Sequence, residues 1–116
     1  MMGRKFVNGV EGGSVSVDDR GLQYGDGLFE TMGATNGRVR RFQSHMARLT
    51  EGCHRLGMPA PPVDLIEADC LRALEGFGAA VVKLTLTRGP GPRAYPPPAE
   101  PSLTRIVVST AQQVSE

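Results

Sequence analysis

Arg48 is the residue whose type and position first suggest ligand binding. The apolar residues around it recur at steps of three and four, which predicts a helix from about Ser44 to Leu56. With Ser44 as N-cap and Gly57 as C-terminal stop, Arg48 falls near the helix start, where unpaired N–H groups and the helix dipole attract anions. Its guanidinium could clamp a phosphate. An arginine exposed on a solvated helix face is the alternative, because most arginines are exposed.

Two histidines and two cysteines are the next residue types that could do chemistry. His45 precedes Arg48 by three residues, so the two share a helical face and His45 could contact the same anion or cap the helix end. His54 has no metal-ligand partner at a suitable spacing and is expected at the surface. Cys53 and Cys70 fall in different predicted helices, which favours two reduced thiols over a zinc site. We expect no metal ion.

A loop over residues 88–101 contains Arg88, Arg93 and Tyr95 together with six of the nine prolines. Proline and glycine keep such a segment irregular, and long ordered loops often bind ligands. Guanidinium groups in this setting suit bidentate binding of a carboxylate, so an acidic substrate is one interpretation. A basic loop without a ligand is the other.

The elements that must position these residues follow from turn signals and periodicity. Asn8-Gly9 and Asn36-Gly37 predict tight hairpin turns, because Asn and Gly adopt the positive φ that such turns need. A second helix follows Pro61-Pro62 and ends near Gly76 or Gly78, while residues 18–21 are interpreted as a polar turn. Alternating or β-branched residues predict strands over 5–7, 15–17, 28–34, 38–42, 79–87 and 103–110. This order predicts one α+β domain over residues 1–116.

The bulk composition excludes several classes of function. With 13 basic and 12 acidic residues the net charge is +1, which gives no electrostatic reason to expect nucleic acid or a membrane surface as partner. The apolar residues make up 40% of the chain and nowhere form an uninterrupted run of the roughly 20 that span a bilayer. The expected protein is a folded, cytoplasmic one without a signal peptide.

Several segments in a fixed order resemble the class IV aminotransferases and lyases, which are fold-type IV pyridoxal-phosphate enzymes. The segments are residues 19–31 (DRGLQYGDGLFET), 36–37 (NG) and 45–49 (HMARL). Residues 83–89 and 93–95 resemble the strand and loop that follow in the same family, so the resemblance spans nearly all of the chain. It implies the small amino-terminal domain of a two-domain enzyme, with a mostly antiparallel sheet and two helices.

The resemblance also implies roles for individual residues. Arg48 is expected to bind the phosphate of pyridoxal 5'-phosphate. Phe29 and Thr31 are expected to lie on a strand that lines the substrate pocket, and Arg93 and Tyr95 in a loop that meets the carboxylates of a small substrate. Family members are usually homodimers, so Arg93 is expected to act across the subunit interface.

No residue of this chain matches the catalytic lysine of the family, which belongs to the second domain. The sequence contains two lysines, Lys5 and Lys83. Lys83 matches a strand position in the family and Lys5 lies near the first strand, so neither takes the catalytic role. The resemblance therefore implies a fragment that lacks the second domain and is inactive alone.

Within the family, residues 88–95 most resemble the aminodeoxychorismate lyases, which form 4-aminobenzoate and pyruvate in folate biosynthesis. A branched-chain or D-amino-acid aminotransferase is the alternative, since the amino-terminal half discriminates poorly among these reactions. A non-catalytic binding or assembly module is a hypothesis from a different class.

Overall fold

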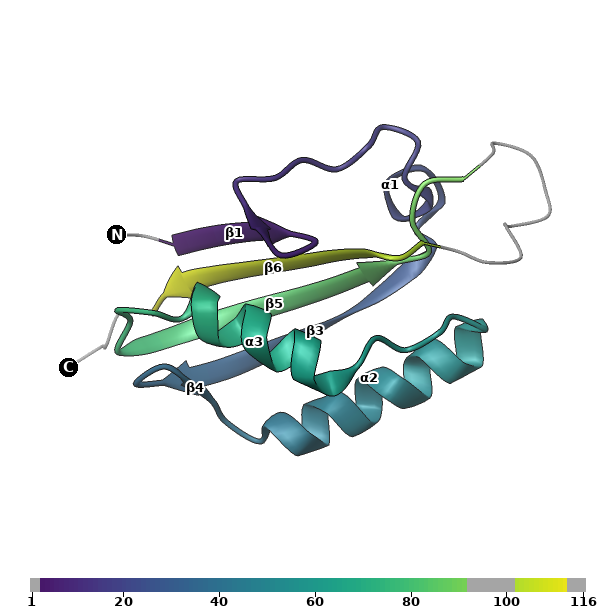
Figure 1. Cartoon of the computed structure of the whole chain (residues 1–116). Coiled ribbons are helices and arrows are strands. Elements are labelled where there is room, and N and C mark those ends of the chain that lie inside the picture. The colour runs from purple at the N-terminus through teal and green to yellow at the C-terminus, as the bar shows by residue number, and fades with distance from the viewer. Residues whose placement is uncertain (1–2, 92–101, 113–116) are drawn as a thin grey trace.

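A six-stranded antiparallel sheet with two helices on one face forms the protein, as seen in a computed structural model that describes residues 3–91 and 102–112 (Figure 1). The strands are β1 (Gly3–Val7), β2 (Val10–Glu11), β3 (Gly27–Thr35), β4 (Arg38–Val39), β5 (Ala79–Thr87) and β6 (Thr104–Ala111). The helices are α1 (Arg20–Tyr24), α2 (Phe42–Leu56) and α3 (Val63–Ala73). Neighbouring strands follow the order β2-β1-β6-β5-β3-β4. The predicted α+β class is confirmed, and the short α1 adds to the two predicted helices.

The three long strands β3, β5 and β6 set the two faces of the sheet. In β3 and β5 the even-numbered residues from Glu30 to Ala34 and from Ala80 to Leu86 are buried, because side chains alternate across a strand and α2 and α3 cover that face. The opposite face, called the open face below, carries Phe29, Thr31 and Lys83. Thr31 lies cross-strand from Lys83. The sheet thus presents one covered and one open surface.

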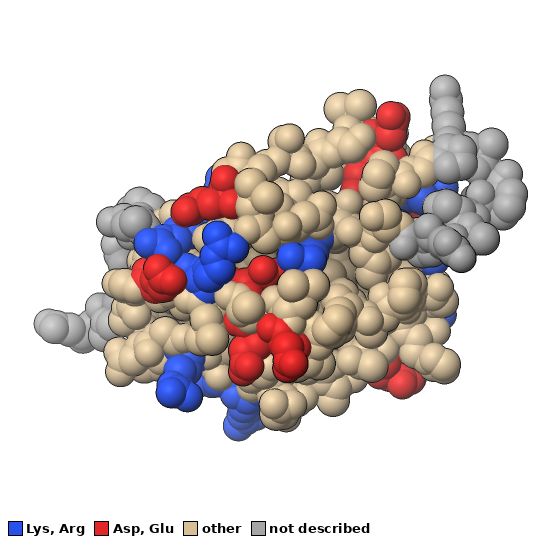
Figure 2. All heavy atoms as spheres, in the orientation of Figure 1, with Lys and Arg blue, Asp and Glu red and all other residues tan. Residues whose placement is uncertain are grey.

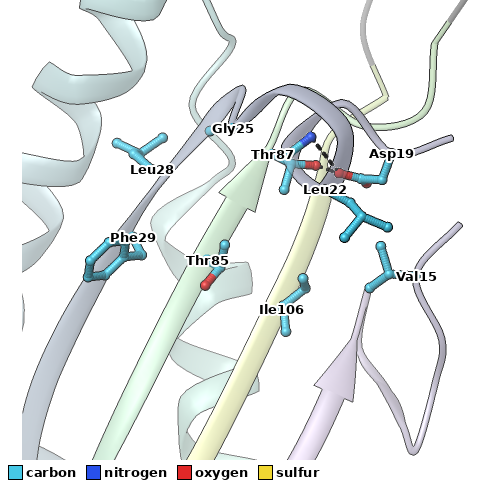
Figure 3. A pocket seen from close by; sticks show the side chains of 11 residues that line it. Val15, Asp19, Leu22, Gly25, Leu28, Phe29, Thr85, Thr87 and Ile106 are labelled. Atoms are coloured by element: carbon cyan, nitrogen blue, oxygen red, sulfur yellow. Dashed lines mark hydrogen bonds between the residues drawn. The ribbon is translucent and has the colours of Figure 1, made fainter. Parts of the chain in front are cut away.

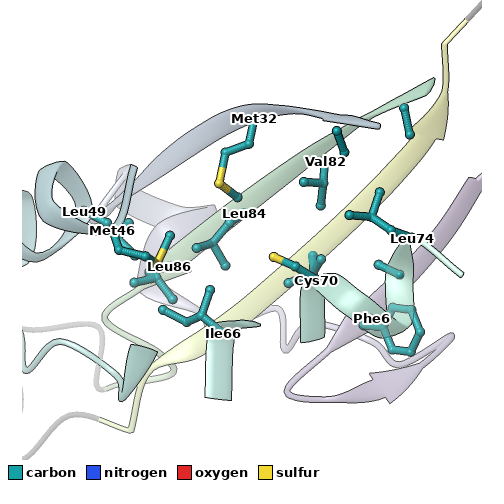
Figure 4. Packing of buried hydrophobic residues seen from close by; sticks show 14 of the residues in the cluster. Phe6, Met32, Met46, Leu49, Ile66, Cys70, Leu74, Val82, Leu84 and Leu86 are labelled. Carbon is teal, nitrogen blue, oxygen red and sulfur yellow. The ribbon is translucent and has the colours of Figure 1, made fainter. Parts of the chain in front are cut away.

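The hydrophobic core lies between the sheet and the two long helices (Figure 4). Side chains from β3 and β5 meet side chains from α2 and α3 there, and each one buried contributes roughly 1.5–3 kcal/mol. Fully buried members include Met32, Leu49, Cys53, Ile66, Cys70, Val82, Leu84 and Leu86. This packing fixes how α2 lies against β3, which decides the geometry of the candidate site.

Helix α2 begins two residues before the predicted start, so Ser44 is not its N-cap. Arg41 precedes the helix in the left-handed region with φ 55°, and no side chain caps the first turn. The predicted strand over residues 38–42 ends at Val39, because the left-handed turn at Arg41 redirects the chain onto the sheet. The predicted stop at Gly57 is confirmed: its φ is 68° and its N–H donates to the carbonyls of Cys53 and His54.

Two further predictions about elements are wrong, and a third is only partly right. Residues 15–17 form no strand, since they pair with no described strand. Of the polar turn predicted at residues 18–21, Asp18 does lie in a turn, but α1 already begins at Arg20, where Asp19 Oδ1 accepts a hydrogen bond of 2.8 Å from the Gly21 N–H. Helix α3 ends at Ala73, three residues before Gly76, because Leu74 already leaves helical geometry.

Candidate functional site

A buried carboxylate on β3 holds two cationic or polar side chains of α2. Glu30 is 8% exposed and faces the covered side of the sheet. Arg48 Nε donates to both Glu30 carboxylate oxygens at 3.2 and 3.0 Å, and Arg48 Nη2 donates to Oε1 at 2.9 Å. His45 Nδ1 lies 2.7 Å from the same Oε1, so this ring nitrogen is the donor. One helical turn places residues 45 and 48 on the same face, which lets both reach one carboxylate.

The charges of this cluster reinforce one another. Burial raises the pKa of Glu30, but hydrogen bonds and positive charge from Arg48 and His45 outweigh it and leave the pKa below its ordinary value. The pKa of Arg48 is raised by its hydrogen bond to Glu30 and by the negative charge there. Glu30 is therefore ionised at neutral pH and fixes the guanidinium in one orientation.

The structure places Arg48 differently from the prediction. It is the seventh residue of α2 and lies in the second turn, so the argument from free N–H groups at the helix start is wrong. The guanidinium itself still fits an anion. Its side chain is 69% exposed, and its Nη1 group makes no hydrogen bond to any residue that the structure describes. Two N–H donors at that edge suit a phosphate group.

Phe29 and Thr31 lie on the opposite face of β3 from Glu30. Phe29 is 59% exposed, and Lys83 Nζ lies 4.5 Å from the centroid of its ring. Among the described strands, β4 pairs with β3 only at Ala34 and Thr35 and leaves the rest of that edge unpaired. Arg48 and the open-face residues are therefore not in direct contact, and a ligand that meets both must pass around the free edge of β3.

A mostly apolar hollow of about 460 Å³ opens beside Phe29 (Figure 3). Its walls come from α1, from the segment before it and from the ends of β3, β5 and β6. The hollow is large enough for a small ligand. Neither Arg48 nor Thr31 lines it. The lining includes Val15, Leu22, Leu28, Phe29, Thr85 and Ile106.

Asp19 lies at one end of this hollow. The sequence indicated only a turn residue there, and the larger role of its side chain was not predicted. Its side chain is fully buried, and its Oδ2 accepts hydrogen bonds from Thr87 Oγ1 at 3.0 Å and Thr104 Oγ1 at 2.5 Å. The backbone of the next residue, Arg20, donates to the Gly89 carbonyl at 2.9 Å. The only sequence signal was an aspartate two residues before a glycine, which is typical of both caps and turns.

Arg88, one of the arginines interpreted as suited to a substrate carboxylate, is held by partners within the protein instead. Its Nε donates to Asp26 Oδ2 at 2.8 Å and its Nη2 donates to the Leu56 carbonyl at the end of α2 at 2.6 Å. Burial raises the pKa of Asp26, but hydrogen bonds from Arg88 and Arg20 outweigh it and lower the pKa overall. Arg88 thus links α2 to the turn before β3. Arg93 and Tyr95 lie outside the described residues.

Residues 3–91 and 102–112 contain neither a cluster of metal-ligating side chains nor a membrane-spanning helix. No group of three or more His, Cys, Asp or Glu side chains in these ranges could hold a metal ion. Within the same ranges, no helix has both the length and the apolar character that crossing a bilayer requires. Glu30 was also missed by sequence reasoning, and its one signal was that it is the single charged residue of β3.

Sequence comparison defines the class of protein. Residues 27–116 match the family model described as amino-transferase class IV, and the chain belongs to that family. An aminodeoxychorismate lyase from Vibrio harveyi is 32% identical over 92 residues, which cover 79% of this chain and 34% of that protein. A D-alanine aminotransferase from Listeria innocua is 30% identical over 105 residues, covering 87% of this chain and 36% of that protein.

Solved structures share the fold. A 4-amino-4-deoxychorismate lyase from Pseudomonas aeruginosa matches with a TM-score of 0.85 at 41% identity, over 97% of this chain and 41% of that chain. The branched-chain amino acid aminotransferase from Escherichia coli matches with a TM-score of 0.83 at 20% identity, over 97% and 42%, which is a likeness of fold alone. The chain spans about a third of the length of the Vibrio harveyi lyase and the Listeria innocua aminotransferase.

Proposed function

We propose that this chain forms the amino-terminal domain of a pyridoxal-phosphate-dependent 4-amino-4-deoxychorismate lyase, which forms 4-aminobenzoate and pyruvate for folate biosynthesis. The observation that carries the proposal is the Arg48 guanidinium, held by Glu30 with Nη1 directed away from that carboxylate. The choice of the lyase rests on identity: 41% to a solved lyase against 20% to a solved branched-chain aminotransferase.

The residues of this chain would bind and orient rather than carry the reaction. Pyridoxal phosphate, when bound, withdraws electrons from the carbon that bears the amino group of the substrate. Arg48 would bind the phosphate through its Nη1 edge, while Glu30 keeps the guanidinium charged and in place. Phe29 would contact the apolar part of the substrate, and Thr31 would offer it a hydroxyl group.

The remaining assignments concern the loop and the assembly. Arg93 and Tyr95 are proposed to bind carboxylates of the substrate, with Arg93 reaching the site of a second copy in a homodimer. We propose a cytoplasmic enzyme. The catalytic lysine is proposed to lie outside this chain, because its two lysines, Lys5 on β1 and Lys83 on β5, do not match the catalytic lysine of the family. On this proposal the 116 residues are inactive alone.

An amino acid aminotransferase is the second candidate. The observation that favours it is the 30% identity to the D-alanine aminotransferase, which extends over a larger share of this chain than the match to the curated lyase, 87% against 79%. Both candidates use the same phosphate site, so Arg48 does not discriminate between them.

The test is a pair of assays on the full-length gene product with added pyridoxal phosphate. With 4-amino-4-deoxychorismate, we expect pyruvate and 4-aminobenzoate in equal amounts. With D-alanine or a branched-chain amino acid and 2-oxoglutarate, we expect little transfer of the amino group. Efficient transfer of the amino group without release of pyruvate would contradict the lyase assignment and support the aminotransferase. A gene product that neither binds the cofactor nor catalyses either reaction would support the binding or assembly module.

A further inference from the structure

Three contacts join α2 to β3 and to the residue just before it, at regular intervals along both elements. Helix and strand run in opposite directions (Figure 1). Along the strand the contacting residues are two positions apart, and along the helix they are four positions apart. Hydrogen bonds make the first and the third contact, and close packing makes the second. The pairs are Arg48 with Glu30, Gly52 with Leu28, and Leu56 with Asp26 through the guanidinium of Arg88.

The two spacings agree because two strand residues and one helical turn cover nearly the same length. Four steps of extended chain, from Asp26 to Glu30, cover about 13 Å. Eight helical residues, from Arg48 to Leu56, cover about 12 Å. All three contacts can therefore form in a single register of α2 on β3. A shift by one helical turn would place Arg48 opposite Leu28 and leave the buried Glu30 carboxylate without its arginine.

Gly52 lets α2 lie close to β3 in the middle of these contacts. A Cβ atom added to Gly52 would lie 2.5 Å from Leu28 Cδ1, well inside van der Waals contact. Glycine is a poor helix former, and Gly52 lies in the interior of a 15-residue helix. Its presence there has a packing reason, since a larger residue would push the helix away from the strand or displace Leu28.

Arg88 holds the C-terminal end of α2. Its Nη2 donates to the Leu56 carbonyl at 2.6 Å, and its Nε donates to Asp26 Oδ2 at 2.8 Å. The Arg88 side chain is largely buried, and Arg20 Nε donates to the same Asp26 oxygen at 3.0 Å. The helix dipole also favours a positive charge at this end. The end of α2 is thus fixed to the residue before β3, just as its first half is fixed to Glu30.

We propose that Gly52 and Arg88 are positioning residues for the phosphate-binding site. They fix the register of α2 on β3 and thereby the place at which Arg48 presents its Nη1 group. Neither residue would touch the phosphate, because Gly52 packs against Leu28 and Arg88 binds the helix two turns beyond Arg48. The inference rests on the proposed function for the cofactor alone, and it holds equally for a lyase and for an aminotransferase.

The test compares the binding of pyridoxal 5'-phosphate with that of pyridoxal, which lacks the phosphate, to the full-length gene product freed of cofactor. Spectrophotometric titration gives the dissociation constants. The variants are Gly52→Val and Arg88→Met, each alone and combined with Arg48→Ala. Gly52→Val is also combined with Leu28→Ala, which moves the bulk from one contacting position to the other. Thr50→Val is the matched control, since it introduces valine at an exposed position of the same helix.

We expect Gly52→Val and Arg88→Met each to raise the dissociation constant for pyridoxal 5'-phosphate about tenfold, in line with the loss of a charge-assisted hydrogen bond. The constant for pyridoxal should change less than about twofold, because that ligand makes no phosphate contact. In the Arg48→Ala background both substitutions should have little further effect, since they act through the same guanidinium. Leu28→Ala should restore the affinity of Gly52→Val, and Thr50→Val should match the wild type.

Unchanged affinity for pyridoxal 5'-phosphate in both variants would overturn the inference. Equal weakening of the two ligands, or effects that persist in full in the Arg48→Ala background, would also overturn it, because they would indicate a general loss of structure. Gly52→Val and its combination with Leu28→Ala decide the question if Arg88→Met does not fold. Failure of the proposed function has a different result: the wild-type protein would bind no pyridoxal 5'-phosphate, and the inference would fall with it.

Discussion

Glu30 and Arg48 are 18 residues apart in the sequence, yet three hydrogen bonds of 2.9 to 3.2 Å join them across β3 and α2. The carboxylate belongs to the buried face of a strand and the guanidinium to a largely exposed position on a helix. Glu30 therefore acts as a fixed anchor that decides where Arg48 presents its free edge.

The acidic and basic side chains visible on the helix-covered face are interspersed, without a large region of one sign (Figure 2).

Replacement of Arg48 tests its assignment as the phosphate-binding residue. Arg48→Ala should raise the dissociation constant for pyridoxal phosphate about tenfold or more, because charge-assisted hydrogen bonds to the phosphate are lost. Glu30→Gln should give a smaller rise, since the guanidinium stays but its orientation relaxes. Arg55→Ala is the control: Arg55 is also exposed on α2, and among the described residues it pairs only with Glu51. Spectrophotometric titration of the full-length gene product measures all three, and similar constants for Arg48→Ala and Arg55→Ala would contradict the assignment.

Acid should destabilise the protein through Glu30 and Asp26. Both carboxyls have folded-state pKa values below their ordinary values of 4.5 and 3.8. The stabilisation they give is therefore complete above those values and is lost as the pH falls through the lowered pKa values. The free energy of unfolding, from urea titrations between neutral pH and about pH 3, should be flat at first and then fall. Glu30→Gln should flatten the acid part of this curve. Glu51→Gln should leave the acid part of the curve unchanged. Equal curves for wild type and Glu30→Gln would show that Glu30 does not cause the loss of stability in acid.

Loss of the Asp19 side chain should destabilise the fold strongly. Asp19→Ala removes the cap of α1 and leaves the buried hydroxyls of Thr87 and Thr104 without their acceptor. The expected loss in the free energy of unfolding is about 2–4 kcal/mol, measured by urea denaturation. Asp18→Ala is the neighbouring control, because the Asp18 side chain is exposed, and it should change stability by less than about 0.5 kcal/mol. A loss of less than about 0.5 kcal/mol for Asp19→Ala as well would show that the buried hydrogen bonds of Asp19 contribute little to stability.

A side chain at Gly89 should be far less tolerated than one at Gly25. Both glycines have positive φ, 87° and 67°. A Cβ atom at Gly89 would collide with the backbone carbonyl of Ser102, whereas nothing lies within 4 Å of one at Gly25. Gly25→Ala should therefore cost only the backbone strain of about 1–2 kcal/mol, and Gly89→Ala clearly more. Thermal unfolding of the two variants compares them, and equal melting temperatures would contradict the close approach.

The long elements of the fold could be predicted from the sequence because local patterns encode them. The steps of three and four from Phe42 to Leu56 specify a helix, and the β-branched runs at Ala79–Thr87 and Thr104–Ala111 specify buried strands. The Asn-Gly pair at residues 36–37 marks a hairpin turn between β3 and β4. The helix start, by contrast, was misplaced, because the left-handed Arg41 that redirects the chain has no local sequence signal.

The sequence alone determined that Arg48 stands on a helix and that Phe29 and Thr31 share one face of a strand, because both follow from the periods of regular structure. Only the tertiary structure decided that Glu30 meets Arg48, that Arg88 is occupied by Asp26, and that Asp19 is buried among threonines. Those contacts join residues far apart in the chain, and the packing of α2 and the pairing of β5 with β6 bring them together. No local pattern carries that information, since each contact depends on how whole elements dock.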